Sequence, residues 1–260
     1  MNSLNLNGRH TIAVGTPTMT PLRIAFDMDG TLADFSAAYA DIESRLFGAA
    51  EVSHDPQAAE AREVEQHGDG ADMPAGDGPL AAKPRATQRR ATGNRDLIWK
   101  TIESTPNFWT SLRPIEQGAV ERLYQLTAEH NWQVFFITQR PATAGRTVQW
   151  QTQQWLVDQG FLMPSVIPIS GGRGRVASAL QLDYLVDDTP HNCVDVLSDS
   201  STRTILLVDA DNPLAETSAR RLGIGTAHNI HQVLDLLVQA TAARANPSLF
   251  EKLRRLVGWK

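Results

Sequence analysis

The sequence has 260 residues, of which 42% are hydrophobic and 20% charged, and its formal net charge is −5. This length predicts one core domain with a smaller insertion, and the negative charge disfavours stable binding to nucleic acid, whose phosphates attract a basic surface. The single cysteine, Cys193, excludes an intrachain disulfide, and no apolar run approaches the ~18–20 residues that span a bilayer.

The first residues do not look like a targeting segment. Residues 1–20 contain no basic start followed by a long apolar stretch, so they do not resemble a signal peptide. We expect them to form a flexible extension ahead of a core domain over residues 21–245. The expected location is the cytoplasm.

Short apolar runs bounded by polar or turn residues predict five buried strands. They lie at residues 22–26, 133–137, 165–169, 183–186 and 204–208. Segments with helical spacing lie between them, notably 116–130, 143–159 and 190–197. Nearly continuous apolar strands separated by helices are typical of a parallel sheet that is covered on both faces. The predicted fold class is therefore α/β, with a doubly wound parallel sheet.

One interval breaks this pattern. From about residue 48 to residue 95 the chain is rich in Ala, Gly, Asp, Pro, Gln and Arg and has almost no large apolar residue. Such a segment cannot bury enough surface to offset its ordering entropy, so we expect it to be disordered. The flanking segments, 36–47 and 96–112, carry enough Trp, Phe, Ile and Leu to pack. We predict a small helical cap inserted after the first strand, over residues 33–115.

The C-terminal segment, residues 246–260, predicts an amphipathic basic helix. Its apolar residues fall near one helical face. Docking on the body of the protein is the simplest expectation, and a membrane-surface or partner helix is the alternative. A homodimer is also left open.

The strongest chemical signal is the motif FDMDGTLADF at residues 26–35, in which Asp27 and Asp29 follow directly on a predicted strand and Gly30 permits a tight turn. In open α/β sheets ligands bind beyond the carboxyl ends of strands. A carboxylate of ordinary pKa is ionised at neutral pH and can attack phosphorus, and a second carboxylate can donate a proton to the leaving oxygen. The plain alternative is a turn with two capping aspartates.

Further polar residues fall at the ends of later strands. Thr138 could hold phosphate oxygens near a helix start, although a threonine there is usually a cap. Asp187 and Asp188 are adjacent acids that a Mg²⁺ ion would compensate, although helix capping is the alternative. Between these strands lies the basic segment 170–180, which could neutralise phosphate or could be a solvated loop.

Taken together, these motifs resemble the haloacid dehalogenase superfamily over residues 22–209. The resemblance implies that Asp27 is the nucleophile that becomes phosphorylated and that Asp29 is the acid and base. It further implies a Mg²⁺ cofactor held by Asp27, the Asp29 backbone carbonyl and Asp187, with Asp188 close by. Thr138 would bind phosphoryl oxygens.

The sequence departs from that family at one position. The third motif of the family usually supplies a lysine, but none of the four lysines of this chain lies near the right place. Arg173 or Arg175 must therefore substitute, and the spacing to Asp187 favours Arg173. Arginine keeps the charge but has a wider planar head, so the exchange is not neutral.

A closer likeness is to the 5′(3′)-deoxyribonucleotidase branch of the superfamily. The segments that carry it are FDMDGTLADF, NFWTSLRPIEQGAVERL, VFFITQRP and LVDDTP. The positions that match its aromatic base pocket are Phe35, Phe108 and Trp109, although such aromatics are often just the core of a cap. Gln139 is a further substrate-binding candidate. With Arg140 it stands where that family usually has small residues.

These observations predict a Mg²⁺-dependent phosphomonoester hydrolase with an aspartyl-phosphate intermediate. The expected partner is a small phosphorylated substrate, with nucleoside monophosphates ahead of sugar phosphates. A nucleic-acid end phosphatase and a non-catalytic binding protein of the same fold are the rival interpretations.

Overall fold

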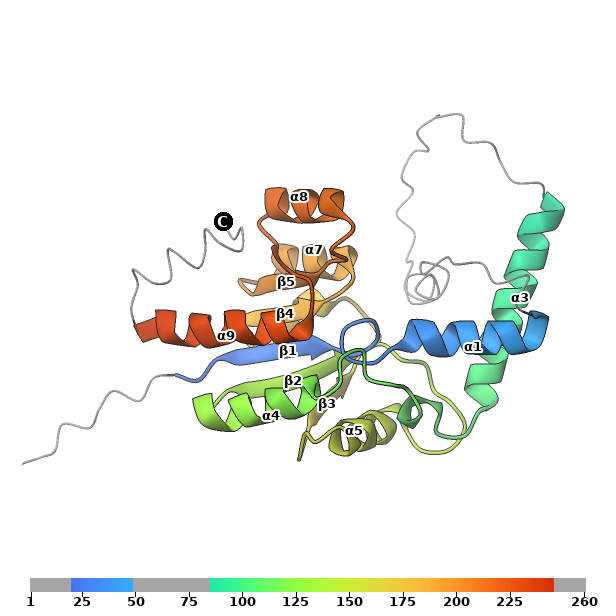
Figure 1. Ribbon diagram of the computed structural model, residues 1–260, viewed down its shortest axis with the longest axis horizontal. Coiled ribbons are helices and arrows are strands. Elements are labelled where there is room, and N and C mark those ends of the chain that lie inside the picture. Colours follow the sequence, from blue (N-terminus) through green and yellow to red (C-terminus); the bar gives the residue numbers. More distant parts are fainter. Residues whose placement is uncertain (1–19, 49–84, 246–260) are drawn as a thin grey trace, which may run out of the picture.

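The computed structural model describes residues 20–48 and 85–245, and within the second range the side chains of residues 92–244 (Figure 1). The predicted extension at residues 1–20, apart from its last residue, therefore lies outside the described residues. So do the C-terminal helix predicted for residues 246–260 and most of the segment predicted to be disordered.

The described part of the chain forms a parallel sheet of six strands in the order β3-β2-β1-β4-β5-β6. This arrangement confirms the predicted fold class, a doubly wound α/β sheet. The predicted strands agree with the observed ones to within about a residue at each end, and the short β6 is additional. The strands are β1 (Arg23–Asp27), β2 (Gln133–Thr138), β3 (Ser165–Pro168), β4 (Tyr184–Asp187), β5 (Arg203–Leu207) and β6 (Gly225–Ala227).

Helices connect and flank these strands. They are α1 (Phe35–Phe47), α3 (Arg85–Ser104), the short 3₁₀ helix η2 (Phe108–Thr110), α4 (Ala119–His130), α5 (Val148–Asp158), α6 (Arg173–Ala179), α7 (Pro190–Asp199), α8 (Pro213–Leu222) and α9 (Ile230–Ala245).

Several helices begin at other residues than the spacing predicts. Helix α4 begins after Gly118, whose φ of +75° is left-handed, so the helix cannot extend back to residue 116 as the spacing predicts. Helix α5 begins at Val148 because the Thr147 side chain accepts a hydrogen bond from the Trp150 backbone N–H. Helix α3 already begins at Arg85, within the segment that composition marked as disordered.

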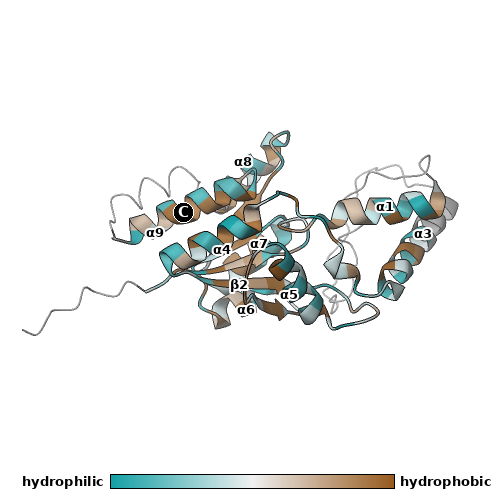
Figure 2. Cartoon of the chain, turned by 60° about the horizontal axis from the view of Figure 1, so that its bottom comes forward, coloured by the Kyte–Doolittle hydropathy of each residue, from teal (hydrophilic) through white to brown (hydrophobic). Residues whose placement is uncertain are grey.

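The two faces of the sheet are covered by different helices. In β1, Ile24 and Phe26 pack in one cluster with residues of α4, α5 and α9, whereas Ala25 packs with residues of α6 and α7 on the other face. Helix α8 covers β5 and β6 beside α7. In Figure 2 the strands are mostly hydrophobic while the helices carry both kinds of residue, as expected for helices with one buried face.

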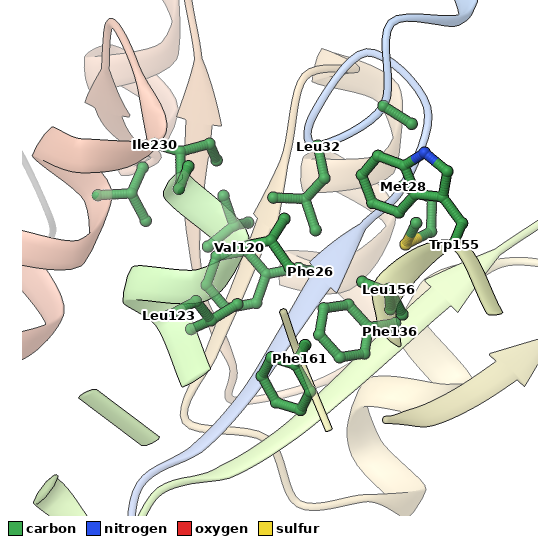
Figure 3. Close-up of a cluster of buried hydrophobic side chains, with 14 of the residues drawn as sticks. Phe26, Met28, Leu32, Val120, Leu123, Phe136, Trp155, Leu156, Phe161 and Ile230 are labelled. Atoms are coloured by element: carbon green, nitrogen blue, oxygen red, sulfur yellow. The ribbon is translucent and has the colours of Figure 1, made fainter. Parts of the chain in front are cut away.

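Aromatic side chains fill the larger core cluster (Figure 3). The Phe136 ring meets the Phe161 ring edge to face, with centroids 4.9 Å apart and planes at 87°. Trp155 of α5 is 1% exposed and donates its indole N–H to the Leu112 carbonyl oxygen at 2.8 Å. This bond ties α5 to the chain that returns from the cap.

The segment predicted to form the cap contains α1, α3 and η2, and α1 and α3 extend past the carboxyl end of β1 (Figure 1). Its first helix begins at Asp34, whose carboxylate accepts a hydrogen bond from the Ala37 N–H at 2.9 Å. The chain enters and leaves the cap side by side, because Asp34 N donates to Arg113 O and Ile115 N donates to Leu32 O. None of the described helices is long and apolar enough to cross a membrane.

Phe136→Ala should lower the free energy of unfolding by about 3–5 kcal/mol, because the phenyl ring is fully buried and its removal leaves a cavity. The matched control is Leu214→Ala on α8, where the side chain is 78% exposed and the change should stay within about 0.5 kcal/mol. Urea denaturation measures both. Equal effects of the two variants would contradict the assigned core.

Candidate active site

The candidate site lies where the direction of strand progression reverses. Strands β1 and β4 are neighbours in the middle of the sheet, and the chain runs outward to β2 and β3 on one side and to β5 and β6 on the other. The register pairs Phe26 with Val186, so Asp27 and Asp187 end the two strands next to each other. Ligands of open α/β sheets bind in the crevice at such a point.

Three carboxylates meet at this edge. Asp27, Asp187 and Asp188 each offer an oxygen, and these oxygens lie within 4.8 Å of one another. Asp27 is 5% exposed and Asp187 is fully buried. Like charges at this distance in a poorly solvated place repel strongly, so the group requires positive charge nearby.

Arg173 supplies part of that charge. It is the first residue of α6 and is 2% exposed. Its guanidinium forms an ion pair with Asp27, and its Nε lies 3.2 Å from Asp187 Oδ2. Arg175, the other candidate for the missing lysine, is exposed on the same helix. Arg173 thus pairs with two of the three carboxylates.

The remaining donor atoms fit a divalent cation. Asp187 Oδ1 accepts hydrogen bonds from Thr189 N and Asn192 Nδ2, whereas its buried Oδ2 accepts none from the described residues. An oxygen-only donor set of three carboxylates is what Mg²⁺ and similar hard cations prefer. Asp27, Asp187 and Asp188 are thus the residues that could hold the metal.

The turn after β1 makes room for Asp188. Gly30 has φ +79°, and a Cβ at this position would lie 1.9 Å from Asp188 Oδ2. Thr31 Oγ1 donates to Asp188 Oδ1 at 3.1 Å. Gly30 is therefore required twice, for the left-handed backbone and for the space that the carboxylate fills.

Close packing of α6 on α7 fixes the position of Arg173. A Cβ on Gly174 would lie 2.5 Å from the Asp195 carbonyl oxygen, so only glycine allows this approach. Gly174 N donates to Asp195 Oδ2 at 2.7 Å. Asp195 thus caps α6 and is not among the clustered carboxylates.

The last residue of β2, Thr138, and the residue after it, Gln139, are polar and lie at the same edge. Thr138 is buried, and its hydroxyl oxygen accepts a hydrogen bond from Arg140 N at 3.4 Å. Gln139 accepts a hydrogen bond from Arg173 Nη1 at 3.3 Å and donates to Gly171 O at 3.1 Å. Gln139 therefore links the end of β2 to the start of α6 and contacts Arg173.

Asp29 is held apart from the three clustered carboxylates. Arg140 Nε and Nη2 each donate to one of its oxygens at 2.7 Å, which makes a bidentate ion pair. In the sequence, Arg140 is noticeable only as a departure from the family pattern. The signal that could have identified it is a long cation two residues beyond Thr138, at the edge where the aspartates gather.

The three aromatic candidates lie together in the cap. Phe35, Phe108 and Trp109 are 8%, 5% and 1% exposed, and their ring centroids are 5.0–6.4 Å apart. Phe108 also borders a cavity of about 150 Å³ whose charged lining residues include Asp41 and Arg113. The three rings are thus packed against one another, and Phe35 also packs against Tyr39 and Trp99.

Cys193 lies on α7 and is fully buried. Burial, together with the nearby charge of Asp187, raises the pKa of its thiol well above the ordinary value. A thiol kept neutral is neither a nucleophile nor a metal ligand. Cys193 therefore belongs to the core.

No protein-family model matches the sequence, and no curated protein matches it. Among solved structures, it is similar to a haloacid dehalogenase-like hydrolase from Streptococcus pneumoniae, with 13% identity, a TM-score of 0.47 and coverage of 84% of this chain and 98% of that chain. It is also similar to a HAD family hydrolase from Deinococcus radiodurans with bound phosphate and sodium, with 15% identity, a TM-score of 0.47 and coverage of 86% of this chain and 96% of that chain. For a phosphonoacetaldehyde hydrolase like protein from Oleispira antarctica the identity is 13%, the TM-score is 0.48, and the coverage is 92% of this chain and 94% of that chain.

Magnesium should stabilise the metal-stripped protein, because an ion that binds only the folded state adds ~2.7 kcal/mol at 100 times its dissociation constant. Asp187→Asn should abolish this gain, since it removes one charge from the cluster while keeping the side-chain shape. Asp211→Asn, an exposed acid in the loop after β5, should keep it. Thermal unfolding with and without magnesium measures the effect. A full gain in Asp187→Asn would place the ion elsewhere.

Proposed function

We propose that this protein is a Mg²⁺-dependent phosphomonoester hydrolase of the haloacid dehalogenase type, which works through an aspartyl-phosphate intermediate. The observation that carries the proposal is the meeting of Asp27, Asp187 and Asp188 around Arg173 at the reversal point of the sheet. The nucleophile and the metal ligands are then supplied by neighbouring strand ends, and the anion-binding cation by the start of α6.

In the first step an Asp27 carboxylate oxygen attacks phosphorus. The Asp27 oxygen–phosphorus bond forms, the bond from phosphorus to the leaving oxygen breaks, and Asp29 gives a proton to that oxygen. Thr138 and Arg173 bind the phosphoryl oxygens, on which charge collects in the transition state. Mg²⁺, when bound by the carboxylates, would neutralise charge on the same oxygens.

In the second step a water molecule attacks the phosphorylated Asp27. Asp29, now ionised, takes a proton from the water as its oxygen bonds to phosphorus, and the bond between phosphorus and Asp27 breaks. Inorganic phosphate leaves and Asp27 is restored. Asp29 thus regains in the second step the proton that it gave up in the first.

Arg173 is suited to binding the phosphoryl oxygens because its planar guanidinium carries several N–H donors. It reaches Asp27, Asp187 and Gln139 together, whereas a lysine ammonium would act as a single point charge. Substrate phosphate would take over the donor that now pairs with Asp27. The nucleophile would then be released as its target arrives.

The proposed substrates are nucleoside monophosphates, in keeping with the likeness of the sequence to deoxyribonucleotidases. A specific observation favours a second candidate, another small phosphomonoester such as a sugar phosphate. Phe35, Phe108 and Trp109 are at least nine-tenths buried against one another, so they offer little ring surface on which a base could stack.

Phosphate release should be measured with magnesium on nucleoside 5′- and 3′-monophosphates, sugar phosphates, a phosphorylated oligonucleotide and an aryl phosphate. We expect turnover of a small phosphomonoester, and a fall of roughly 10³-fold or more in Asp27→Asn, which removes the nucleophile. Asp211→Asn is the matched control and should keep full activity, because this acid lies in an exposed loop.

The outcome also distinguishes the candidates. Turnover of nucleotides supports the nucleotidase proposal, and turnover restricted to sugar or aryl phosphates supports the second candidate. Activity on oligonucleotides alone would indicate an end phosphatase. No turnover of any substrate, by folded wild-type protein with magnesium, would sink the enzymatic proposal and leave a non-catalytic binding protein.

A further inference from the structure

The Asp29 side chain is held by an arginine that the proposed chemistry does not use. Arg140 donates to both carboxylate oxygens of Asp29, from Nε and Nη2, at 2.7 Å each. The Arg140 side chain has no exposed surface and that of Asp29 is 14% exposed. A fully buried guanidinium with two parallel bonds fixes the plane of the carboxylate as well as its position.

The guanidinium is itself fixed from two further directions. Arg140 Nη1 donates to the buried Thr152 hydroxyl of α5 at 2.9 Å. Its guanidinium carbon lies 4.8 Å from the centroid of the Trp109 ring, which places the cation over the indole face. Arg140 therefore joins a helix of the core, an aromatic ring of the cap and Asp29.

The Trp109 ring is anchored as firmly. Its indole N–H donates to the Pro141 carbonyl oxygen at 3.0 Å, and its backbone N–H donates to Gln151 Oε1 at 3.1 Å. Gln151 in turn donates to Thr143 Oγ1 and to Arg146 O. Hydrogen bonds thus connect the loop after β2, helix α5 and η2 into one network, which fixes the ring against which Arg140 packs.

We propose that Arg140 is a positioning residue for the reaction, which acts by holding the ionised Asp29, the form that takes a proton from water in the second step, away from the three clustered carboxylates. This inference rests on the proposed function. Without its partner, Asp29 could rotate towards the metal-binding group, two residues away along the chain. Asp29 and Thr152 engage three of the five N–H donors of Arg140, and its side chain has no exposed surface, so it is not placed to bind substrate.

The test is a double-mutant cycle on kcat and KM with an aryl phosphate as substrate and magnesium present. An aryl leaving group departs without a proton donor, so the first step survives in Asp29→Asn and kcat reports the second step, in which Asp29 takes a proton from water. The variants are Arg140→Ala, Asp29→Asn and the combination of both. The control is Arg146→Ala, because Arg146 also lies over a tryptophan, 5.4 Å from the centroid of the Trp150 ring, but is exposed and pairs with no carboxylate among the described residues.

Arg140→Ala alone should lower kcat roughly 100-fold, the loss expected when a reacting group is misplaced by about an ångström, with KM nearly unchanged. In the Asp29→Asn background the same change should lower kcat by less than about 3-fold, because residues that act as a unit are not additive. Arg146→Ala should behave as wild type. Arg140→Lys should recover only part of the activity, since an ammonium cannot form the bidentate pair of hydrogen bonds with both Asp29 oxygens.

Two results would overturn the inference. One is an increase in KM at unchanged kcat, which would make Arg140 a phosphate-binding residue. The other is an equal loss with and without Asp29, which would show that it acts independently of that carboxylate. If Arg140→Ala does not fold, as judged by circular dichroism, Arg140→Lys in both backgrounds carries the same comparison. Failure of the proposed function is recognised separately, because wild type would then release no phosphate.

Discussion

The structure depends on the compensation of three carboxylates that meet where two neighbouring strands end. Asp27 and Asp187 arrive there because β1 and β4 are adjacent and in register, and Asp188 follows by one residue. Burying such a group without positive charge would be severely unfavourable. The tight turn at Gly30, the close packing of α6 on α7 and the reach of Arg173 are all arrangements that make the cluster tolerable.

Much of the core could be predicted from the sequence because its strands are buried on both faces and appear as continuous apolar runs. Asp27 and Asp187 were predictable for the same reason, since each ends such a run. Strand β6 has only three residues, Gly225–Ala227, which is too short to stand out. Helix α3 begins at Arg85 in a polar segment whose composition suggested disorder. Composition reflects the lack of large apolar residues there, but it does not show that the segment continues into helical turns that are packed.

What the sequence could not provide was the pairing of side chains across the site. Arg140 and Asp29 are far apart in the chain, and no spacing rule connects them. The same limit applies to the aromatics: Phe108 and Trp109 are conspicuous as letters, but only the packing shows that their rings are turned towards each other. Substrate preference is therefore the least predictable property, since it depends on which surfaces are left uncovered after the cap has packed.

The joined entry and exit of the cap have a consequence for how the chain can vary. Backbone hydrogen bonds join Leu32 to Ile115 and Asp34 to Arg113, so the two chain segments that lead into and out of the cap are held together at its base. The entropy of closing the intervening loop rises only slowly with its length. Insertions and deletions between these points would therefore barely disturb the register of β1 and β2. Evolution can remodel what covers the site while the carboxylates beneath it stay in place.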